Sequence, residues 1–251
     1  MLGRPFGEGE GGAAQNLLHG VRRRSRLLDE VGPVAEQSIG DVLGKALGEH
    51  RLANLRRRDL LPMEFAAYGL NGARVDRIAQ RVGGSKNLIY HYFGSKDRLY
   101  LNALEAIYRQ MRAEQDDLAL QQLPPLEGMR QLVANTFDHF VRAPALIRLM
   151  SIENIHFARH LKKSKSVKPL YAPLLRTIRS LLAKGQADGV FRRNVDAVDL
   201  YISMSGLAYF YLSNRHSLAW IFDEPLDEPK RLQQRRAHVV DVILGYLQYG
   251  A

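Results

Sequence analysis

Apolar residues recur at helical spacing almost without interruption from residue 61 to the C-terminus, and this periodicity is the feature that most constrains the fold. No stretch there alternates apolar and polar residues for long enough to form a sheet. The periodicity therefore predicts an all-α chain. We expect a helix over 62–68 that ends at Gly69, a second one up to Gly83-Gly84, and two more after Ser85 and Ser95, the last persisting to Pro124-Pro125. Further helices are expected near 126–142, 144–163, 168–187, 195–214 and 231–249.

The segment GGSKNLIYHYFGSKDRL, residues 83–99, contains the pair Ser-Lys twice, as Ser85-Lys86 and Ser95-Lys96. A serine ahead of an apolar-periodic stretch is a favoured N-cap, because its hydroxyl accepts a hydrogen bond from an amide of the first turn. Each helix start also exposes backbone N–H groups at its positive end, and the adjacent lysine adds a cation. We therefore expect two helix starts that can each hold a phosphate.

The short helix between the two pairs divides into two faces at about 100° per residue. The face that we expect to pack inward carries Leu88, Ile89, Tyr92 and Phe93. The opposite face carries groups that can donate hydrogen bonds to phosphates or base edges, which are Lys86, Asn87, Tyr90 and His91. This composition is typical of a recognition helix that enters a DNA groove.

The preceding helix and the Gly83-Gly84 turn complete a helix-turn-helix. Arg74, Arg77 and Arg81 lie on that helix, where we expect them to supply charge for the DNA backbone. A basic helical face is also commonly just solvated, so the residues alone leave both interpretations open.

The charge and composition favour an anionic partner and exclude several kinds of site. The 251 residues carry a formal net charge of +10, which attracts polyanions such as nucleic acid. Cysteine is absent, which excludes disulfides and thiolate metal sites, and we expect neither a metal centre nor a cofactor. No apolar run reaches the roughly 18 residues of a membrane span, and no signal peptide is visible, so we expect a cytoplasmic protein without a membrane partner.

An enzyme is the alternative from another functional class, and the sequence offers little for it. It contains no phosphate-binding glycine loop, no His-Glu zinc spacing and no nucleophile elbow. Ser85 could imitate a nucleophile, but the cap role explains it better. We expect no enzymatic activity.

Residues 69–105, GLNGARVDRIAQRVGGSKNLIYHYFGSKDRLYLNALE, resemble the DNA-binding domain of the TetR/AcrR repressors. The resemblance implies that Arg74 faces a phosphate and that Lys96 grips the flanking backbone. It also implies a reading helix in the major groove that carries Ser85 at its start and then Lys86, Asn87, Tyr90 and His91. A repressor of this family would bind a palindromic operator as a homodimer, be released by a small-molecule effector, and be found at the nucleoid.

The resemblance divides the chain into three parts. Residues 61–110 would form the helix-turn-helix three-helix domain, and a long helix would join it to a helical ligand-binding and dimerisation domain over 111–251. Residues 1–60 form an atypical extension whose glycine-rich start we expect to be disordered. The helices near 195–214 and 231–249 would pair across a two-fold axis, with burial inside one subunit as the competing interpretation.

The C-terminal part is also expected to hold the effector. Segments 209–222 and 235–247 resemble the tails of family members that include pyrimidine-responsive regulators. The polar and aromatic residues best placed to line a pocket are His139, Asn154, His156, Phe157, Tyr171 and Tyr209, and each could instead fill the core.

Two residues depart from the family pattern and leave a second function open. Pro62 interrupts the first helix, where proline is tolerated only in the first turn. Gly84 stands where relatives carry a buried valine, which removes roughly 1–3 kcal/mol of packing. The alternative is therefore a helical dimer that binds a small molecule and whose DNA-binding domain is impaired.

Overall fold

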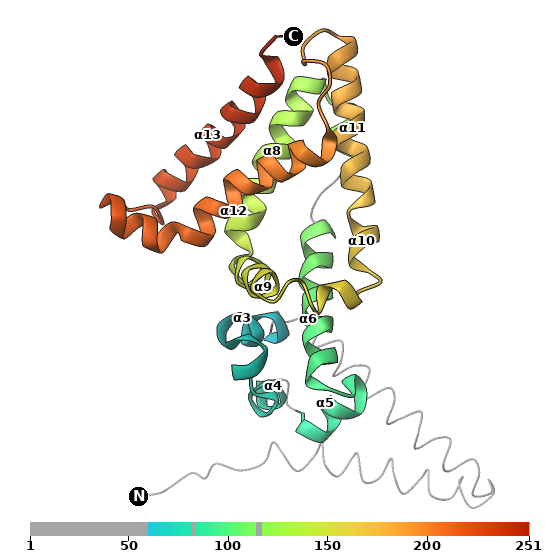
Figure 1. The fold of residues 1–251 in the computed structure, drawn as a ribbon, viewed down its shortest axis with the longest axis vertical. Helices are drawn as coiled ribbons and strands as arrows, with labels where there is room; N and C mark the ends of the chain where they lie inside the picture. The colour runs from blue at the N-terminus through green and yellow to red at the C-terminus, as the bar shows by residue number, and fades with distance from the viewer. Residues whose placement is uncertain (1–59, 82–83, 114–116, 251) are drawn as a thin grey trace, which may run out of the picture. The chain divides into compact units, whose positions relative to one another are not determined.

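The computed structural model describes residues 60–81, 84–113 and 117–250. Within these ranges the ordered elements are helices and there is no strand, so the all-α prediction is confirmed (Figure 1). The extension over 1–60 lies outside the described residues except for Leu60, as do residues 82 and 83 of the predicted turn. No described helix is both long and apolar enough to cross a bilayer.

The N-terminal helices are α3 (Leu60–Gly72), α4 (Val75–Arg81), α5 (Lys86–Phe93) and α6 (Lys96–Ala113). Pro62 is the third described residue of α3, and the helix continues past it. The backbone leaves helical geometry at Gly69, whose φ of 65° suits a residue without a side chain. Phe65, Ile78 and Ile89 are buried and form the small core of this region.

The C-terminal helices are arranged around α8 (Pro125–Arg142). This helix packs against α11 (Ala172–Ala187), α12 (Ala197–Phe222) and α13 (Pro229–Gln248), as Figure 1 shows. The core along α8 is apolar and fully buried, with Met129, Leu132 and Phe137 at its centre. The remaining elements are α7 (Asp117–Gln122), α9 (Pro144–Ile155), the 3-10 turn η1 (Leu161–Lys163) and α10 (Val167–Leu170).

The helix predicted to persist to Pro124-Pro125 corresponds to α6 and α7, and residues 114–116 between them lie outside the described residues. Beyond Pro125, three predicted helices differ from the structure, each for a local reason. The helix predicted over 144–163 ends at Ile155, because Phe157 and Ala158 both adopt φ of 55°. The helix predicted over 168–187 is divided at Tyr171, two residues before Pro173 in the first turn of α11. The helix predicted to end at 214 continues to Phe222 and stops at Asp223, which is left-handed.

We expect Gly185→Ala to lower the free energy of unfolding by roughly 1–3 kcal/mol, because this position of α11 has no room for a methyl group. A Cβ at Gly185 would overlap the ring of Phe191, which is itself 2% exposed. Urea unfolding measures the change. Arg179→Ala, on the exposed face of the same helix, is the control and should stay within about 0.5 kcal/mol of the parent protein. Equal stability of the two variants would contradict this packing.

Candidate nucleic-acid interface

Two serine caps fix the starts of α5 and α6. Ser85 has an extended backbone (φ −104°, ψ 157°), and its Oγ accepts a hydrogen bond from the N–H of Leu88 at 3.1 Å. Ser95 Oγ accepts from the N–H of Arg98 at 3.2 Å. Between them, Gly94 ends α5 with φ of 72° and donates its N–H to the carbonyl of Tyr90. Both predicted caps are confirmed.

Three of the four residues that were predicted to point outward from α5 are exposed. Lys86, Asn87 and His91 are exposed, and Tyr90 is half-buried. On the opposite side Ile89 is 1% exposed and anchors the helix. The other residues predicted to face inward are only half-buried; they are Leu88, Tyr92 and Phe93. The helix has eight residues and packs against α4 and α6, which do not cover this face completely.

A buried carboxylate that the sequence did not reveal joins α3 to α4. Glu64 is 1% exposed, and its Oε1 accepts hydrogen bonds from the backbone N–H of Arg74 at 3.0 Å and from Nε of Arg77 at 2.8 Å. The other oxygen, Oε2, pairs with the guanidinium of Arg81 at 3.3 Å. One carboxylate therefore binds Arg74, just before α4, and Arg77 and Arg81 on successive turns of that helix.

The electrostatics of this contact favour the ionised carboxylate. Burial of Glu64 raises the pKa of its carboxyl, but the hydrogen bonds from Arg77 and from the Arg74 N–H, with the charges of Arg77 and Arg81, outweigh burial and leave the pKa below its ordinary value. The stabilisation is present above the ordinary carboxyl pKa and is lost as the pH falls through the lowered value.

Arg77 and Arg81 have a partner within the domain that the sequence did not reveal, and their contact with DNA stays a prediction. Both were expected to supply charge for DNA, but both guanidinium groups are paired with Glu64, and that of Arg77 also lies 4.1 Å from the centre of the Tyr68 ring. Their charge is used inside the domain, because an ionised buried acid requires nearby donors. An exposed arginine at helical spacing gives no sign of such a partner.

The other predicted DNA-binding cations remain at the surface. The side chain of Arg74 is exposed. Lys86 Nζ lies 3.2 Å from Asp76 Oδ2 in a solvent-exposed pair. Lys96 Nζ donates to the carbonyl of Asn71 at 3.1 Å, at the C-terminal end of α3. Their contact with DNA stays a prediction.

A row of three rings connects the N-terminal helices to the C-terminal region. Phe65 of α3 packs edge-on against Tyr100 of α6, with ring centres 5.1 Å apart, and Tyr100 packs edge-on against His160 at 4.9 Å. His160 Nδ1 lies 3.1 Å from the buried carboxylate of Glu153, which also accepts the backbone N–H groups of His160 and Leu161. This segment therefore contacts α6 directly and α3 through the ring of Tyr100.

The six predicted effector contacts do not meet at one place. His139 lines a cavity between α3, α6, α8 and α9. Tyr209 lies apart from it, with its hydroxyl 2.7 Å from that of Ser151, and Tyr171 packs against Tyr108 and Tyr201. The other three are exposed at or just after the C-terminal end of α9 and do not line this cavity. These are Asn154, His156 and Phe157.

Comparisons with known proteins identify two segments of the chain. Residues 63–103 match the family model described as bacterial regulatory proteins, tetR family. Residues 125–243 match the one described as tetracyclin repressor-like, C-terminal domain. The two matches cover the helix-turn-helix with part of α6, and the helices around α8.

Two curated relatives are repressors by name. The HTH-type transcriptional repressor NicS of Pseudomonas putida is 34% identical over 155 residues, which are 62% of this chain and 73% of that protein. The HTH-type transcriptional repressor SCO4008 of Streptomyces coelicolor is 29% identical over 146 residues, or 58% and 70% of the two chains.

Solved structures share the fold at lower sequence identity. The Streptomyces coelicolor protein SCO4942 gives a TM-score of 0.55 at 24% identity and covers 75% of this chain and 94% of its own. A protein from Mesorhizobium loti gives a TM-score of 0.59 at 16% identity, with 79% and 96% covered.

Glu64→Gln is expected to lower the free energy of unfolding by about 1–3 kcal/mol at neutral pH, because an amide cannot replace the charge that faces two guanidinium groups. Urea unfolding of both proteins from neutral to acidic pH checks this. The difference should shrink as the pH falls through the lowered pKa of Glu64, where the parent carboxyl is protonated.

The matched control is Asp76→Asn, which breaks the exposed pair with Lys86 and should change the free energy of unfolding by less than about 1 kcal/mol. Equal losses for Glu64→Gln and Asp76→Asn, or a loss that is independent of pH, would show that Glu64 does not hold the domain together.

Proposed function

The chain belongs to the tetR family of bacterial regulatory proteins and is a DNA-binding regulator of transcription, and from this we propose that it is a repressor that binds a palindromic operator as a homodimer and is released by a small-molecule effector. The observation that carries the proposal is α5, a helix capped by Ser85 and anchored by Ile89 that presents Lys86, Asn87 and His91 to solvent. Repression is supported by the names of the relatives NicS and SCO4008.

In this proposal the two ends and the outer face of α5 contact DNA. Asn87 and Tyr90 would contact base edges in the major groove, with His91 beside them. The free N–H groups after Ser85 and the cations Lys86 and Lys96 would bind phosphates on either side. Arg74 would add a further backbone contact.

The burial of the first helix against α6 favours this proposal over an impaired DNA-binding domain. α3 continues past Pro62, which lies near its described start, and leaves helical geometry at Gly69. Phe65, one turn after Pro62, is fully buried against Tyr100. The turn at Gly84 is closed by its N–H, which donates to the carbonyl of Ala79 at 2.9 Å.

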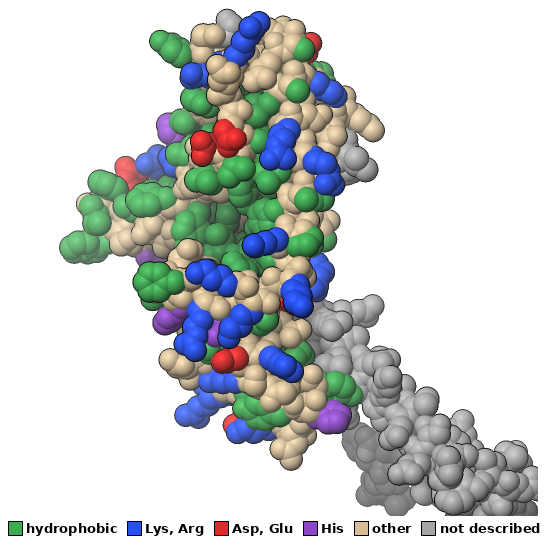
Figure 2. Space-filling view, turned by 45° about the vertical axis from the view of Figure 1, so that its right-hand side comes forward, with side chains coloured by type: hydrophobic (Ala, Val, Ile, Leu, Met, Phe, Trp, Pro, Cys, Tyr) green, Lys and Arg blue, Asp and Glu red, His purple; other side chains and the backbone are tan. Residues whose placement is uncertain are grey.

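The exposed apolar faces of α12 and α13 support a homodimer. Val198, Ile202 and Phe210 follow one another along α12 at helical spacing, and Val242 and Tyr246 do so on α13, all at least 41% exposed. Hydrophobic side chains also gather at the projecting end of α12, as Figure 2 shows. Pairing two such helices from each subunit across a two-fold axis would cover these side chains and set two α5 helices on successive major grooves.

Release by an effector requires a modest coupling between the two regions. The row of rings from His160 through Tyr100 to Phe65 offers a contact route from the C-terminal helices to the DNA-binding helices. Coupling of about 1–3 kcal/mol is enough to change operator occupancy. The proposal includes no enzymatic step, and it assigns the protein to the cytoplasm, at the nucleoid where an operator is found.

We expect Lys86→Ala and Lys96→Ala each to flatten the salt dependence of DNA binding. The slope of log affinity against log salt should fall by about one unit per lost phosphate contact. Fluorescence anisotropy measures the slope, with a duplex that the protein has selected from chromosomal DNA. Arg179→Ala removes an exposed charge far along the chain, on α11, and should leave the slope unchanged. Equal slopes for all four proteins would refute the assignment of these lysines.

Phe210→Glu is expected to convert the dimer to monomers and to weaken operator binding together with it, because a charge would be buried in the apolar contact. Sedimentation velocity gives the oligomeric state. The control is Ile155→Glu, which introduces the same charge at a residue that is 70% exposed on α9, and it should remain dimeric. A Phe210→Glu protein that still sediments as the parent protein does would place the interface elsewhere.

A further inference from the structure

A segment of strongly positive charge joins α9 to α11. Residues 154–187 contain no aspartate and no glutamate. Five cationic side chains follow one another in the first half of this stretch, and all five are exposed: Arg159, Lys162, Lys163, Lys165 and Lys168. Within the described part of the chain, none of their charged groups forms an ion pair or a hydrogen bond. Figure 2 shows lysine and arginine side chains gathered across the middle of one face of the molecule. The segment therefore attracts anions.

The acids that contact the segment bind parts of it other than its cations. Glu153 is 2% exposed and accepts the backbone N–H groups of His160 at 3.1 Å and of Leu161 at 2.9 Å. Glu105 of α6 accepts a hydrogen bond from Ser164 Oγ at 2.6 Å. These carboxylates fix the backbone of the segment against the fold, and the lysine and arginine side chains remain directed to solvent.

The segment runs alongside α6 in the same direction. Near its start, the ring of His160 packs edge-on against that of Tyr100, with centres 4.9 Å apart. Near its end, the carbonyl of Leu170 accepts a hydrogen bond from Nε of Arg112 at 3.3 Å. Later residues of the segment therefore lie beside later residues of α6, and its first residues lie closest to the start of that helix.

The start of α6 is where Lys96 would bind a DNA phosphate. Lys96 lies one turn before Tyr100 on the same face of the helix, which is about 6 Å along its axis at 1.5 Å per residue. By the same measure, the contact at Arg112 lies about 24 Å from Lys96. Measured along α6, the cations next to His160 are therefore separated from that phosphate by less than about one Debye length, roughly 8–10 Å at physiological salt. These cations are Arg159, Lys162 and Lys163.

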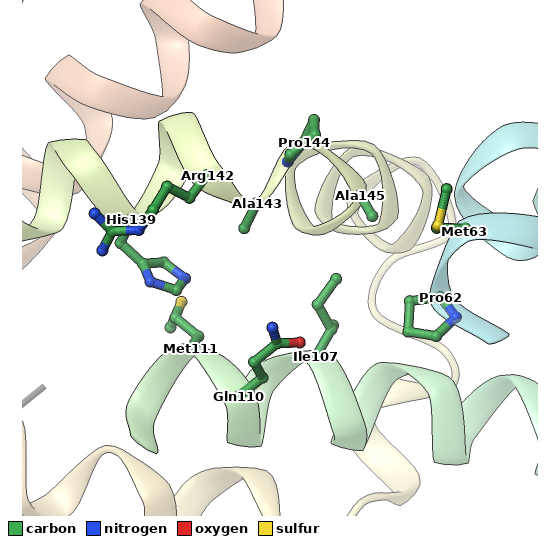
Figure 3. A pocket seen from close by; sticks show the side chains of 10 residues that line it. All are labelled: Pro62, Met63, Ile107, Gln110, Met111, His139, Arg142, Ala143, Pro144 and Ala145. Carbon is green, nitrogen blue, oxygen red and sulfur yellow. The ribbon is translucent and has the colours of Figure 1, made fainter. Parts of the chain in front are cut away.

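We propose that Arg159, Lys162 and Lys163 form a second phosphate-binding surface, which contacts the DNA backbone beyond the phosphates held by α5 and Lys96. The inference rests on the proposed function, since it extends the contact with the same DNA. Phosphate contacts raise affinity without reading the sequence, so the surface strengthens specific and non-specific binding alike. It is separate from the cavity between α3, α6, α8 and α9, which none of these three residues lines (Figure 3).

The neighbouring apolar residues make an anionic membrane the competing partner. Ile155 and Phe157 are 70% and 84% exposed, and apolar side chains beside cations suit the surface of a bilayer. An interfacial helix, however, needs an apolar face along its length. Between the lysines the segment offers serines, while Val167 is buried and Leu161 is half-buried. The exposed apolar side chains end where the lysines begin, which favours DNA.

Fluorescence anisotropy with the selected duplex tests the surface in the full-length protein. The triple variant Arg159→Ala, Lys162→Ala, Lys163→Ala should flatten the slope of log affinity against log salt by about two to three units, because each lost phosphate contact removes about 0.9. The ratio of its affinities for the selected duplex and for a scrambled duplex should stay within about twofold of the parent ratio, because phosphate contacts carry no sequence information.

The matched control removes three exposed charges from the same acid-free stretch, farther along α6 and on α11. It is the triple variant Lys168→Ala, Arg176→Ala, Arg179→Ala, and it should change the slope by less than about half a unit. Circular dichroism and melting temperature establish that both variants are folded. A parent-like slope for the first variant, equal slopes for the two variants, or a loss of sequence preference in the first would overturn the surface.

Two further outcomes separate this inference from its rivals. A parent protein that binds no selected duplex would refute the proposed function together with the surface, whereas an unchanged slope would refute the surface alone. Sedimentation with vesicles of phosphatidylglycerol tests the membrane. Vesicle binding that the first variant loses, with an unchanged salt slope on DNA, would assign the cations to a bilayer and overturn the inference.

Discussion

The arrangement of the DNA-binding helices depends on one buried carboxylate. Glu64 is removed from water, and it can remain ionised only because the backbone N–H of Arg74 and the guanidinium groups of Arg77 and Arg81 surround it. These groups come from the start, the middle and the end of a short helix, so a single acid sets the direction of α4 against α3. The direction of α5 follows, because Ile89 packs into the same small core. The caps at Ser85 and Ser95 fix the first turns of α5 and α6, which lie on either side of Gly94.

A second buried acid plays a similar part at the junction with the C-terminal helices. Glu153 accepts the N–H groups of His160 and Leu161 and thereby stabilises the chain after the left-handed residues Phe157 and Ala158. Burial raises the pKa of the neighbouring Tyr100 hydroxyl, and the charge of Glu153 raises it further, so this phenol stays neutral. The ring of Tyr100 touches both His160 and Phe65. The two regions of the protein therefore meet through packed rings, and a cavity lies next to the same helices, α3, α6 and α9.

Much of the DNA-binding half could be predicted from the sequence, because its determinants are local. A serine three residues before the amide that it caps, a glycine at a helix end, and the faces of an eight-residue helix are all set within one or two turns. The pairing of Arg77 and Arg81 with Glu64 could not be predicted, since it joins residues 13 and 17 positions apart in separate helices. The cavity was missed for the same reason: Met63, Gln110 and Arg142 are brought together only by the packing of three helices. The helix ends were predicted wrongly where the backbone adopts a left-handed conformation, as at Phe157, because the spacing of apolar residues does not indicate backbone conformation.

The central claim is that the outer face of α5 enters the major groove of a two-fold symmetric site. Dimethyl sulfate methylation of the bound duplex tests it directly, because this reagent modifies guanine N7 in the major groove and adenine N3 in the minor groove. The account predicts protection of guanine N7 in two stretches whose centres lie about one helical turn apart, and loss of that protection when Asn87 and Tyr90 are replaced by alanine. Protection limited to adenine N3, or guanine protection that persists without Asn87 and Tyr90, would contradict it.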